Sequence, residues 1–376
     1  MSSMTAQRAD TYVFVSSRSG PRLARAERRL LEVMKALLGA GASVHLICPP
    51  RSPVEQLARD IGVEIAPYHL DRINVVRTRS RLRKFLQRHR PRVVHSTGWL
   101  ADYLVRWAAA PLSVPVVNTI HCVNWPPHGS SSLSSWLARI FTRANLTRAS
   151  AIMVDCQELR QPLTQAGVVS ERIFYDPPSI DITRVEEEAA IPIFGPLPGH
   201  PPYVGYSGAL EHSRGLGVLA QMSAILNLRH ARATVVIAGD GPAERDLAEA
   251  VENRRVYRVH EVPSVPAMLQ HFDVCVFPSV EAGTPTTLLE AAALGRPIVA
   301  SSVPGIRGLF EDGEQIVLVP PGNANALAAA IASVLNDPAS AKRMGERARK
   351  RVAEEYTTAA SVGRHLELYS DLATRG

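Results

Sequence analysis

Two glutamates bracket the start of an expected helix in the stretch EAGTPTTLLEAAALG, residues 281–295. Thr284 suits an N-cap, Pro285 suits the first helical position, and a glycine ends the run. The N–H groups of the first turn, around Thr286 and Thr287, have no partners within the helix and carry the positive end of its dipole. This helix start is therefore suited to a phosphate group.

The two carboxylates fit the rest of a nucleotide sugar. Glu290 lies five residues past Pro285, which is about 7–8 Å along a helix axis, and a carboxylate there could accept hydrogen bonds from ribose hydroxyls. Glu281 precedes the turn, on the side of the phosphates where a sugar would lie. The pattern predicts a clamp for a nucleotide-diphosphate sugar. A βα loop with two solvated glutamates is the alternative interpretation.

Strand-like runs place this helix at the edge of a sheet. Apolar, β-branched runs alternate with helical segments; they span 11–15, 43–49, 92–98, 115–121, 151–156, 203–208, 233–240, 274–279, 297–302 and 316–320. Such alternation predicts an α/β protein with parallel, doubly wound sheets. The helix of residues 281–295 follows the run 274–279 directly, so it begins at the carboxyl edge of a sheet, where open α/β sheets bind ligands.

The chain is long enough for two domains. A segment rich in proline and acidic residues interrupts the alternation near residue 190. We expect a Rossmann-like domain over 1–180, a linker over 181–200, a second Rossmann-like domain over 201–355 and a closing helix over 356–376.

Composition limits where the protein works. No window approaches about 18 uninterrupted apolar residues, so no transmembrane helix is expected, and MSSMTAQRAD lacks the apolar core of a signal peptide. The four cysteines are far apart and form no Cys-x-x-Cys pair, which argues against structural zinc and a disulfide framework. We expect a cytoplasmic protein, either free or peripheral on the inner face of the cell membrane.

The charge is concentrated in the first half. Residues 1–180 hold 24 basic and 12 acidic residues, a net charge of +12, whereas the remainder carries −5. Eight basic residues lie in the stretch from Arg77 to Arg92, with Leu82, Phe85 and Leu86 among them. This pattern predicts a basic amphipathic helix that either lies on an anionic membrane surface or presents a solvated face. Nucleic acid is not expected as a partner, because few aromatic residues are interleaved.

A family resemblance rests on an ordered series of motifs. The stretch 277–306, FPSVEAGTPTTLLEAAALGRPIVASSVPGI, resembles the E-x7-E segment of retaining GT-B glycosyltransferases of family four. Further stretches resemble successive units of that fold: VVHSTGWLADYLVRWAA, VPVVNTIHC, YVGYSGALEHSRGLGVL, VVIAGDGPAERDL, HFDVCVFPS and GERARKRVAEEY. The resemblance covers nearly the whole chain. It implies a GT-B fold of two Rossmann-like domains facing a central cleft, with the donor held mainly by the second domain and the closing helix returning to the first.

The resemblance assigns the two glutamates. Glu290 matches the second family glutamate, which binds the ribose. Glu281 stands nine positions before it, where the family spacing is eight. Either Glu281 still reaches the sugar, or the backbone around Ala282 and Gly283 takes that role.

The family's phosphate-binding run G-R-L-x-x-x-K-G occurs here as residues 208–215. Gly208 is kept, Ala209 replaces the arginine, and Arg214 replaces the lysine and brings a fork that can grip a diphosphate. Without the arginine, a charge that would stabilise the leaving diphosphate is missing. The candidates to supply it from the first domain are Arg18, Arg22 and Arg25.

Other family positions are carried over with alternatives. His121, at the end of a strand, matches the histidine that approaches the donor sugar; otherwise it is a core histidine. The base is expected at backbone groups from Val259 to Val262. Gly20 either replaces the family's glycine pair in approaching the ligand or makes an ordinary turn.

The resemblance implies a reaction. A sugar would pass from a nucleotide-diphosphate sugar, with UDP favoured over GDP, to a glycan or lipid-linked acceptor, with retention of anomeric configuration and no protein nucleophile. Synthesis of a surface polysaccharide or glycolipid is the expected setting. The chain has no Asp-x-Asp and the fold usually needs no metal, so no metal or other cofactor is expected. Two alternatives are a weakened partner subunit that binds nucleotide sugar, which the Ala209 and Ala282 positions favour, and a sugar-nucleotide epimerase.

Overall fold

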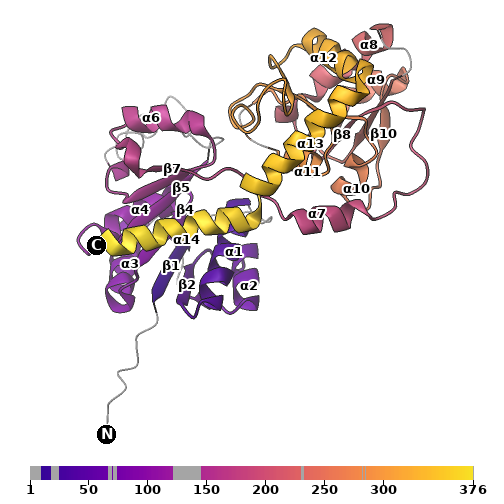
Figure 1. Ribbon diagram of the computed structural model, residues 1–376. Helices are drawn as coiled ribbons and strands as arrows, with labels where there is room; N and C mark the ends of the chain where they lie inside the picture. Colours follow the sequence, from indigo (N-terminus) through magenta and orange to yellow (C-terminus); the bar gives the residue numbers. More distant parts are fainter. Residues whose placement is uncertain are drawn as a thin grey trace. The chain divides into compact units, whose positions relative to one another are not determined.

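Every expected apolar run contains a strand in the computed structural model (Figure 1). The structure describes residues 10–17, 25–66, 70, 74–121, 145–229, 233–281, 283 and 285–375. The chain divides into two units, one comprising Met1–Asp176 with Ser361–Gly376 and the other comprising Pro177–Ala360. We call them unit 1 and unit 2.

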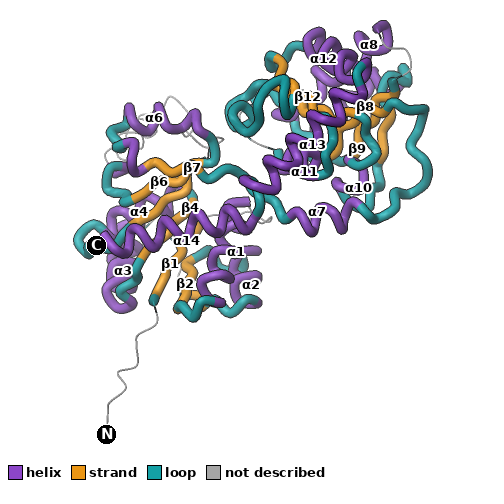
Figure 2. Tube along the Cα trace, in the orientation of Figure 1, coloured by secondary structure: helices purple, strands orange, loops and turns teal. Residues whose placement is uncertain are grey.

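Unit 1 is built on a parallel sheet of seven strands in the order β3-β2-β1-β4-β5-β6-β7. Figure 2 shows strands of this sheet in orange, among them β1, β2, β4, β6 and β7. Its elements are β1 (Thr11–Ser16), α1 (Arg25–Gly39), β2 (Ser43–Ile47), α2 (Pro53–Asp60), β3 (Glu64–Ile65), α3 (Val75–His89), β4 (Val93–Thr97), α4 (Trp99–Ala109), β5 (Val116–Ile120), β6 (Ala151–Val154), α6 (Arg160–Gln165) and β7 (Ile173–Tyr175). Alternation along β1 separates two cores, because Tyr12 and Phe14 pack with α1 while Val13 and Val15 pack with α3 and α4. The sheet is therefore covered on both faces, as a parallel sheet requires.

Unit 2 contains a parallel sheet of six strands in the order β10-β9-β8-β11-β12-β13. Its elements are α7 (Ile182–Ala189), β8 (Tyr203–Ser207), α8 (Leu216–Arg229), β9 (Thr234–Ala238), α9 (Ala248–Glu252), β10 (Tyr257–Val259), α10 (Val265–Leu269), β11 (Val274–Phe277), α11 (Thr286–Ala293), β12 (Ile298–Ser301), β13 (Val317–Val319), α12 (Ala324–Asn336) and α13 (Pro338–Glu355). The strand order reverses between β8 and β11, as in the Rossmann fold. A ligand is expected at that point, beyond the carboxyl ends of these two strands.

The expected linker, 181–200, is not a linker in the structure. It lies inside unit 2 and contains α7, whose N-cap Asp181 accepts a hydrogen bond from the backbone N–H of Arg184 at 3.2 Å. Val185 and Ala189 of this helix are buried. The segment resembled a linker because most of its acidic residues face solvent. Its apolar signal is weak, because only Val185 and Ala189, one turn apart, are buried along this short helix. The chain passes between the units at Asp176 and again at Ala360.

The last helix, α14 (Thr358–Arg375), binds unit 1 through a buried polar network. The Asp176 carboxylate, only 2% exposed, pairs with Arg29 and with Arg364 and accepts a hydrogen bond from Ser361 at 3.1 Å. Burial raises the pKa of Asp176, but Arg29, His365 and Arg364 outweigh it and hold the pKa below its ordinary value. Asp176 is the last residue of unit 1 before the chain enters unit 2, and Ser361 is the first residue after it returns. Their contact therefore holds the two crossing points together.

The basic stretch forms α3 and packs its apolar stripe inward. Leu82 and Leu86 are fully buried in the core of unit 1, whereas the basic side chains Arg77, Arg81, Lys84 and Arg88 are exposed. The stripe that suggested an amphipathic helix is thus already covered by the protein's own core. None of the described helices is both long enough and apolar enough to span a bilayer.

Candidate functional site

The loops after β8 and β11 pack closely at the carboxyl edge of the unit 2 sheet. The Val280 N–H donates to the Ser213 carbonyl at 3.0 Å, which joins the two loops. Gly215 ends the first loop with φ +70°, and a Cβ there would lie 2.0 Å from the Pro278 carbonyl oxygen. Only glycine fits this contact, so the run of residues 208–215 is held against the segment that leads into α11.

Helix α11 begins one residue later than the sequence indicated. Its N-cap is Pro285 and its first residue is Thr286, so the expected assignment of Thr284 as N-cap and Pro285 as first helical residue is wrong. The shift arises because Pro285 keeps an extended ψ of 126° and starts the helix through its carbonyl, which accepts from the Leu288 N–H at 3.1 Å. Thr286 and Thr287 nevertheless stand in the first turn, as expected for a phosphate site.

Thr287 and Gly208 are neighbours across the two loops. A Cβ built on Gly208 would lie 3.4 Å from Thr287 Cγ2, and the Gly208 N–H donates to the Ala238 carbonyl at 3.0 Å. Ser207, the last residue of β8, is fully buried, and its hydroxyl has no hydrogen-bond partner among the described residues. Gly208 therefore brings backbone without a side chain of its own against Thr287 in the first turn of α11.

A cavity of about 570 Å³ opens beside this turn. Its lining comes from α7, from the segment before α10 and from α11: Arg184, Glu188, Ile191, Pro263, Ser264, Val265, Pro266, Thr286, Thr287 and Glu290. Glu290 is 7% exposed. Its Oε1 lies 3.4 Å from Arg184 Nη2, while Arg184 Nη1 lies 2.7 Å from Glu188 Oε1. One guanidinium thus orients two carboxylates on the cavity wall, and it comes from the segment that the sequence suggested was a linker.

Arg214 and Ala209, the two altered positions of the run 208–215, differ in exposure. The Arg214 side chain is 18% exposed and lies 3.8 Å from the Glu211 carboxylate. The Tyr206 hydroxyl donates to the Ala209 carbonyl at 2.7 Å, and burial raises the pKa of Tyr206 to about 12, a shift that Arg214 partly opposes. Ala209 itself is exposed. A longer side chain at this position would extend into solvent without disturbing the loop.

The other residues predicted for the donor site lie in different environments. Glu281 is exposed, and the Gly283 N–H donates to the Pro304 carbonyl at 2.8 Å, so that amide is already engaged. Val259 and Val262 pack their side chains against the unit 2 core. Gly20 and Thr284 lie outside the described residues, as does Ala282.

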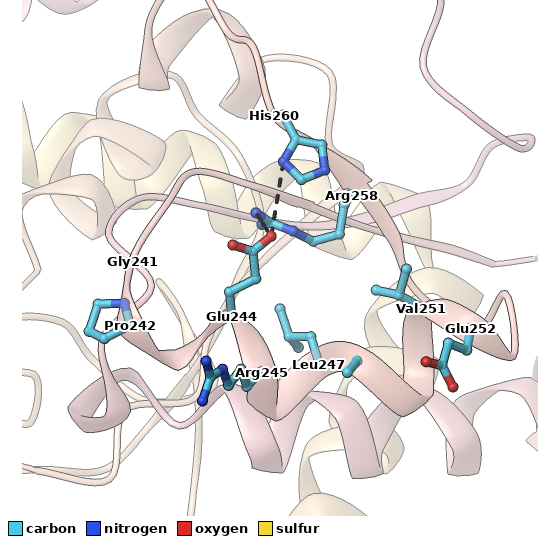
Figure 3. A pocket seen from close by; sticks show the side chains of 10 residues that line it. Gly241, Pro242, Glu244, Arg245, Leu247, Val251, Glu252, Arg258 and His260 are labelled. Atoms are coloured by element: carbon cyan, nitrogen blue, oxygen red, sulfur yellow. Dashed lines mark hydrogen bonds and ion pairs between the residues drawn. The ribbon is translucent and has the colours of Figure 1, made fainter.

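A second cavity of unit 2, about 800 Å³, is drawn in Figure 3. The Glu244 carboxylate lies between two basic side chains, 3.0 Å from Arg258 Nη2 and 4.0 Å from His260 Nδ1. The Arg258 side chain is 5% exposed, and its Nη2 also donates to the Gly239 carbonyl at 2.8 Å. The other two guanidinium nitrogens, Arg258 Nε and Nη1, are buried and have no hydrogen-bond partner among the described residues. Arg258 and His260 line this second cavity, and residues 263–266 line the cavity of about 570 Å³. The backbone expected to bind the base, Val259 to Val262, belongs to the same stretch of chain.

His121 lies at the carboxyl edge of the sheet of unit 1. It directly follows β5, and its Nδ1 lies 2.9 Å from Asp155 Oδ2, just beyond β6. The His121 side chain is 22% exposed, so it is neither a solvated surface residue nor sealed in the core. Asp155 was not among the predicted residues; only the pairing of β5 with β6 brings it to the histidine.

No group of three or more His, Cys, Asp or Glu side chains placed to hold a metal ion occurs in the part of the chain that the structure describes.

Comparisons with known proteins identify the family. The family model for glycosyl transferases group 1 matches residues 201–337, and that for a glycosyl transferase 4-like domain matches residues 26–178. The chain belongs to the group 1 glycosyltransferases, with the GT-B fold. Its two matched segments fall in unit 2 and unit 1 respectively.

Individual relatives agree with that assignment. A glycogen synthase of Mycobacterium tuberculosis is 31% identical over 71% of this chain and 66% of its own length. A colanic acid biosynthesis glycosyltransferase, WcaL, of Salmonella typhimurium is 30% identical over 53% of this chain and 51% of its own. The chain thus spans less than two thirds of each of these curated relatives. The crystal structure of Anabaena Alr3699/HepE in complex with UDP superposes with a TM-score of 0.77 at 16% identity, covering 96% of this chain and 100% of that one.

Proposed function

We propose that this protein transfers a sugar from a nucleotide-diphosphate sugar to a glycan or lipid-linked acceptor. The observation that carries the proposal is Glu290. Burying a carboxylate is unfavourable unless it is compensated, and Glu290 is 7% exposed. It lines a cavity beside the first turn of α11. The helix begins at the switch point of a Rossmann-like sheet, where phosphates bind.

The diphosphate, the ribose and the base would each contact a different group of residues. The diphosphate would lie at the first turn of α11, against Thr286 and Thr287, with the Arg214 guanidinium as its cation. The ribose hydroxyls would donate to Glu290, whose orientation Arg184 fixes at 3.4 Å. The base would lie along the backbone from Val259 to Val262. From Thr287 and Thr286 to Glu290, the ribose-to-phosphate reach along α11 is about 4.5–6 Å at about 1.5 Å per residue.

The chemistry we propose needs positioning and charge more than a protein nucleophile. The acceptor hydroxyl attacks on the face from which the diphosphate departs, and a phosphate oxygen takes its proton, so anomeric configuration is retained. The helix start and Arg214 stabilise the charge that develops on the leaving diphosphate. The family motifs assign His121 and Glu281 to the transferred sugar. No metal is needed in this scheme.

UDP is our preferred donor nucleotide, and polysaccharide or surface-glycan synthesis our preferred setting. The structure of Alr3699/HepE was solved with UDP, and the curated relatives are named for glycogen and colanic acid. Contact with an anionic membrane through α3 would be mainly electrostatic, because Leu82 and Leu86 are buried and cannot insert, although Val76 at the start of the helix is 68% exposed. Such binding would place the protein at the inner face of the cell membrane without an anchor.

A second function, a subunit that binds nucleotide sugar without turning it over, is favoured by one observation. Two family features for the sugar and the leaving group are altered together: Ala209 stands where the family has an arginine, and Ala282 stands at the strict family spacing of the first glutamate. Glu290 and Arg214 would still hold the nucleotide in such a protein.

Calorimetric titration separates these cases. Metal-free protein is titrated with UDP and with GDP, and then with a panel of UDP-sugars or GDP-sugars, with Glu290→Gln as the control. We expect UDP to bind, and hydrolysis or transfer of its sugar to follow in the presence of saccharide acceptors. Binding without any turnover would establish the partner-subunit function instead. Absence of binding by both nucleotides would refute both.

A further inference from the structure

The second cavity of unit 2, drawn in Figure 3, lies on the opposite face of the sheet from the donor cavity. The chain moves outward from β9 to the edge strand β10 through the 3-10 helix η5 (Pro242–Leu247) and α9, and it returns from β10 to β11 through α10. Right-handed crossovers that run in opposite directions put their helices on opposite faces of a sheet. The cavity that η5 and α9 line is therefore separate from the one beside α10 and α11.

A helix face and a strand face meet across the second cavity. Arg258 and His260 are two positions apart at β10 and its end, so they point to the same side of the strand. Figure 3 shows both of them beside Glu244 of η5. Val259, between them, packs against the core of unit 2. The apolar part of the lining comes from η5 and α9 and includes Leu247, Ala248 and Val251.

The guanidinium of Arg258 is buried with little compensation. Its side chain is 5% exposed, and only Nη2 has partners, the Gly239 carbonyl at 2.8 Å and Glu244 Oε1 at 3.0 Å. Nε and Nη1 are buried without a hydrogen-bond partner among the described residues. Burying donors in this way lowers the stability of a fold, so stability alone does not account for Arg258. Its one charged contact does, because the guanidinium fixes the Glu244 carboxylate at the cavity.

The groups that a ligand would meet are the exposed ones. The Glu244 side chain is 48% exposed and makes both of its contacts through Oε1, which leaves Oε2 to accept a hydrogen bond. Arg245, Glu252 and His260 are exposed and line the same cavity. The charges of the two arginines and the two glutamates in the lining cancel. The cavity thus offers several hydrogen-bond donors and acceptors but little net charge.

We propose that this cavity binds a saccharide, a segment of the glycan that the enzyme extends; the identity of that glycan as the acceptor rests on the proposed function. Sugar hydroxyls both donate and accept, so they match Glu244 Oε2 and Glu252 as acceptors and Arg245 as a donor, while Val251 would contact the C–H face of a ring. The volume of about 800 Å³ is in the range of ligand sites. A phosphate or nucleotide fits worse, because it would meet two carboxylates without a net positive charge.

The position of the cavity defines which part of the glycan it would hold. Because it lies across the sheet from the donor cavity, the bound segment is an earlier part of the chain and not the end that receives the sugar. Holding that segment would raise the effective concentration of the acceptor end between transfers. The site should therefore matter for long acceptors and not for short ones.

Histidine NMR of the full chain tests the site directly. The protein has 12 histidines; they are labelled with ¹³C at Cε1, and His260→Gln assigns the resonance of His260. Maltoheptaose, mannotriose, cellotriose and chitotriose serve as probes, with glycerol, inorganic phosphate and UDP as controls. We expect the His260 resonance to shift saturably with at least one saccharide and not with glycerol or phosphate. His271, exposed just after α10, is the internal control and should not shift.

Variants at exposed carboxylates test the contacts without threatening the fold. Glu252→Ala should raise the saccharide Kd about tenfold, as expected for lost hydrogen bonds to a charged group. Glu249→Ala is the matched control: Glu249 lies on the same helix with its side chain 85% exposed but does not line the cavity, so the Kd should change less than about twofold. Glu244→Gln should weaken binding less than Glu244→Ala, because an amide oxygen can still accept. Arg258 is a positioning residue in this scheme, so Arg258→Lys should retain more affinity than Arg258→Met when both variants are folded.

Transfer assays connect the site to the reaction. Glu252→Ala should raise the KM for a long saccharide acceptor and leave the KM values for a short acceptor and for the donor unchanged. Equal effects on long and short acceptors would overturn the proposal. So would the absence of a His260 shift with every saccharide probe, an equal shift at His271, or a shift produced only by phosphate or UDP.

Failure of this site and failure of the proposed function are distinguishable. Saccharide binding at His260 in a protein that binds no nucleotide would refute the proposed function and leave the site standing. Nucleotide binding and turnover without any His260 shift would refute the site and leave the proposed function standing.

Discussion

Replacing Glu290 with glutamine gives the sharpest test of the donor site. The carboxylate is 7% exposed and faces a cavity of about 570 Å³. If both ribose hydroxyls donate to it, each hydrogen bond to a charged group contributes about 1.5–3 kcal/mol. The net gain is smaller, because Glu290 is already partnered by Arg184 at 3.4 Å in the free protein. We therefore expect a loss of about 2 kcal/mol, or a roughly 30-fold rise in the Kd for UDP.

A cycle with a modified ligand isolates the contact. Calorimetry would compare UDP with 2′,3′-dideoxy-UDP on the wild type and on Glu290→Gln. The wild type should bind the dideoxy ligand more weakly than UDP. The variant should bind both ligands about equally, because it lacks the carboxylate that the ribose hydroxyls would contact. Glu188→Gln is the matched control, since Glu188 shares the guanidinium of Arg184 and lines the same cavity. It should change the UDP affinity less than about twofold.

Two results would refute this reasoning. Equal affinity of the wild type for UDP and its dideoxy analogue would show that no carboxylate reads the ribose. A Glu188→Gln effect as large as that of Glu290→Gln would show that the orientation of Arg184, and not a ribose contact, determines affinity.

Four further variants test other parts of the molecule. Arg214→Ala should raise the Kd for UDP at least about tenfold and leave uridine binding unchanged in calorimetry, because only the diphosphate meets the guanidinium. Ala209→Arg, at an exposed position, should raise kcat more than it changes donor affinity in a sugar-release assay; an unchanged kcat would show that this chain supplies the charge elsewhere. Asp176→Asn should lower the free energy of unfolding by about 3–5 kcal/mol at neutral pH. Because the folded-state pKa of this carboxyl is lowered, its contribution is present above pH ~3.9 and lost as the pH falls through the folded-state pKa, so urea unfolding at several pH values should show less acid sensitivity in the variant. Replacing three exposed basic residues of α3 with glutamate should abolish co-sedimentation with phosphatidylglycerol vesicles at low salt, and the wild type should be released by high salt; retention at high salt would indicate insertion.

The sheets were predictable because most strands are apolar runs buried on both faces. Runs such as 274–279 carry that signal by themselves, and β11 occupies Val274–Phe277 within it. Three edge strands were missed. β3 has two residues and β7 and β10 have three each. Unlike the equally short β13, which lies within the apolar run 316–320, they have no longer apolar run around them. Their existence depends on a neighbouring strand that a local pattern cannot see.

The site was predictable where its residues are consecutive and not where they are distant. The helix start at residues 285–287 and the glutamate one turn further on lie in a single stretch, so their juxtaposition follows from helix geometry. The pairing of Arg184 with Glu290 joins residues 106 positions apart, and the local composition around Arg184 indicated a linker. His121 and Asp155 are 34 positions apart, and their contact required the order of the strands, which nothing local in the sequence encodes.

The departures from the family pattern act on one step of the proposed reaction. In the proposed site, nucleotide binding would rely on Glu290 and the first turn of α11, which are buried or fixed by the packing of two loops. Arg214 lies on one of these loops, between Ser213 and Gly215. Leaving-group stabilisation relies on added positive charge, and here Arg214 is partly compensated by Glu211 at 3.8 Å while Ala209 contributes none. Electrostatic stabilisation acts where charge develops, so the loss falls on the transition state more than on the ground state. A chain built this way would keep nucleotide affinity and lose turnover first, which is why binding and turnover must be measured separately in this protein.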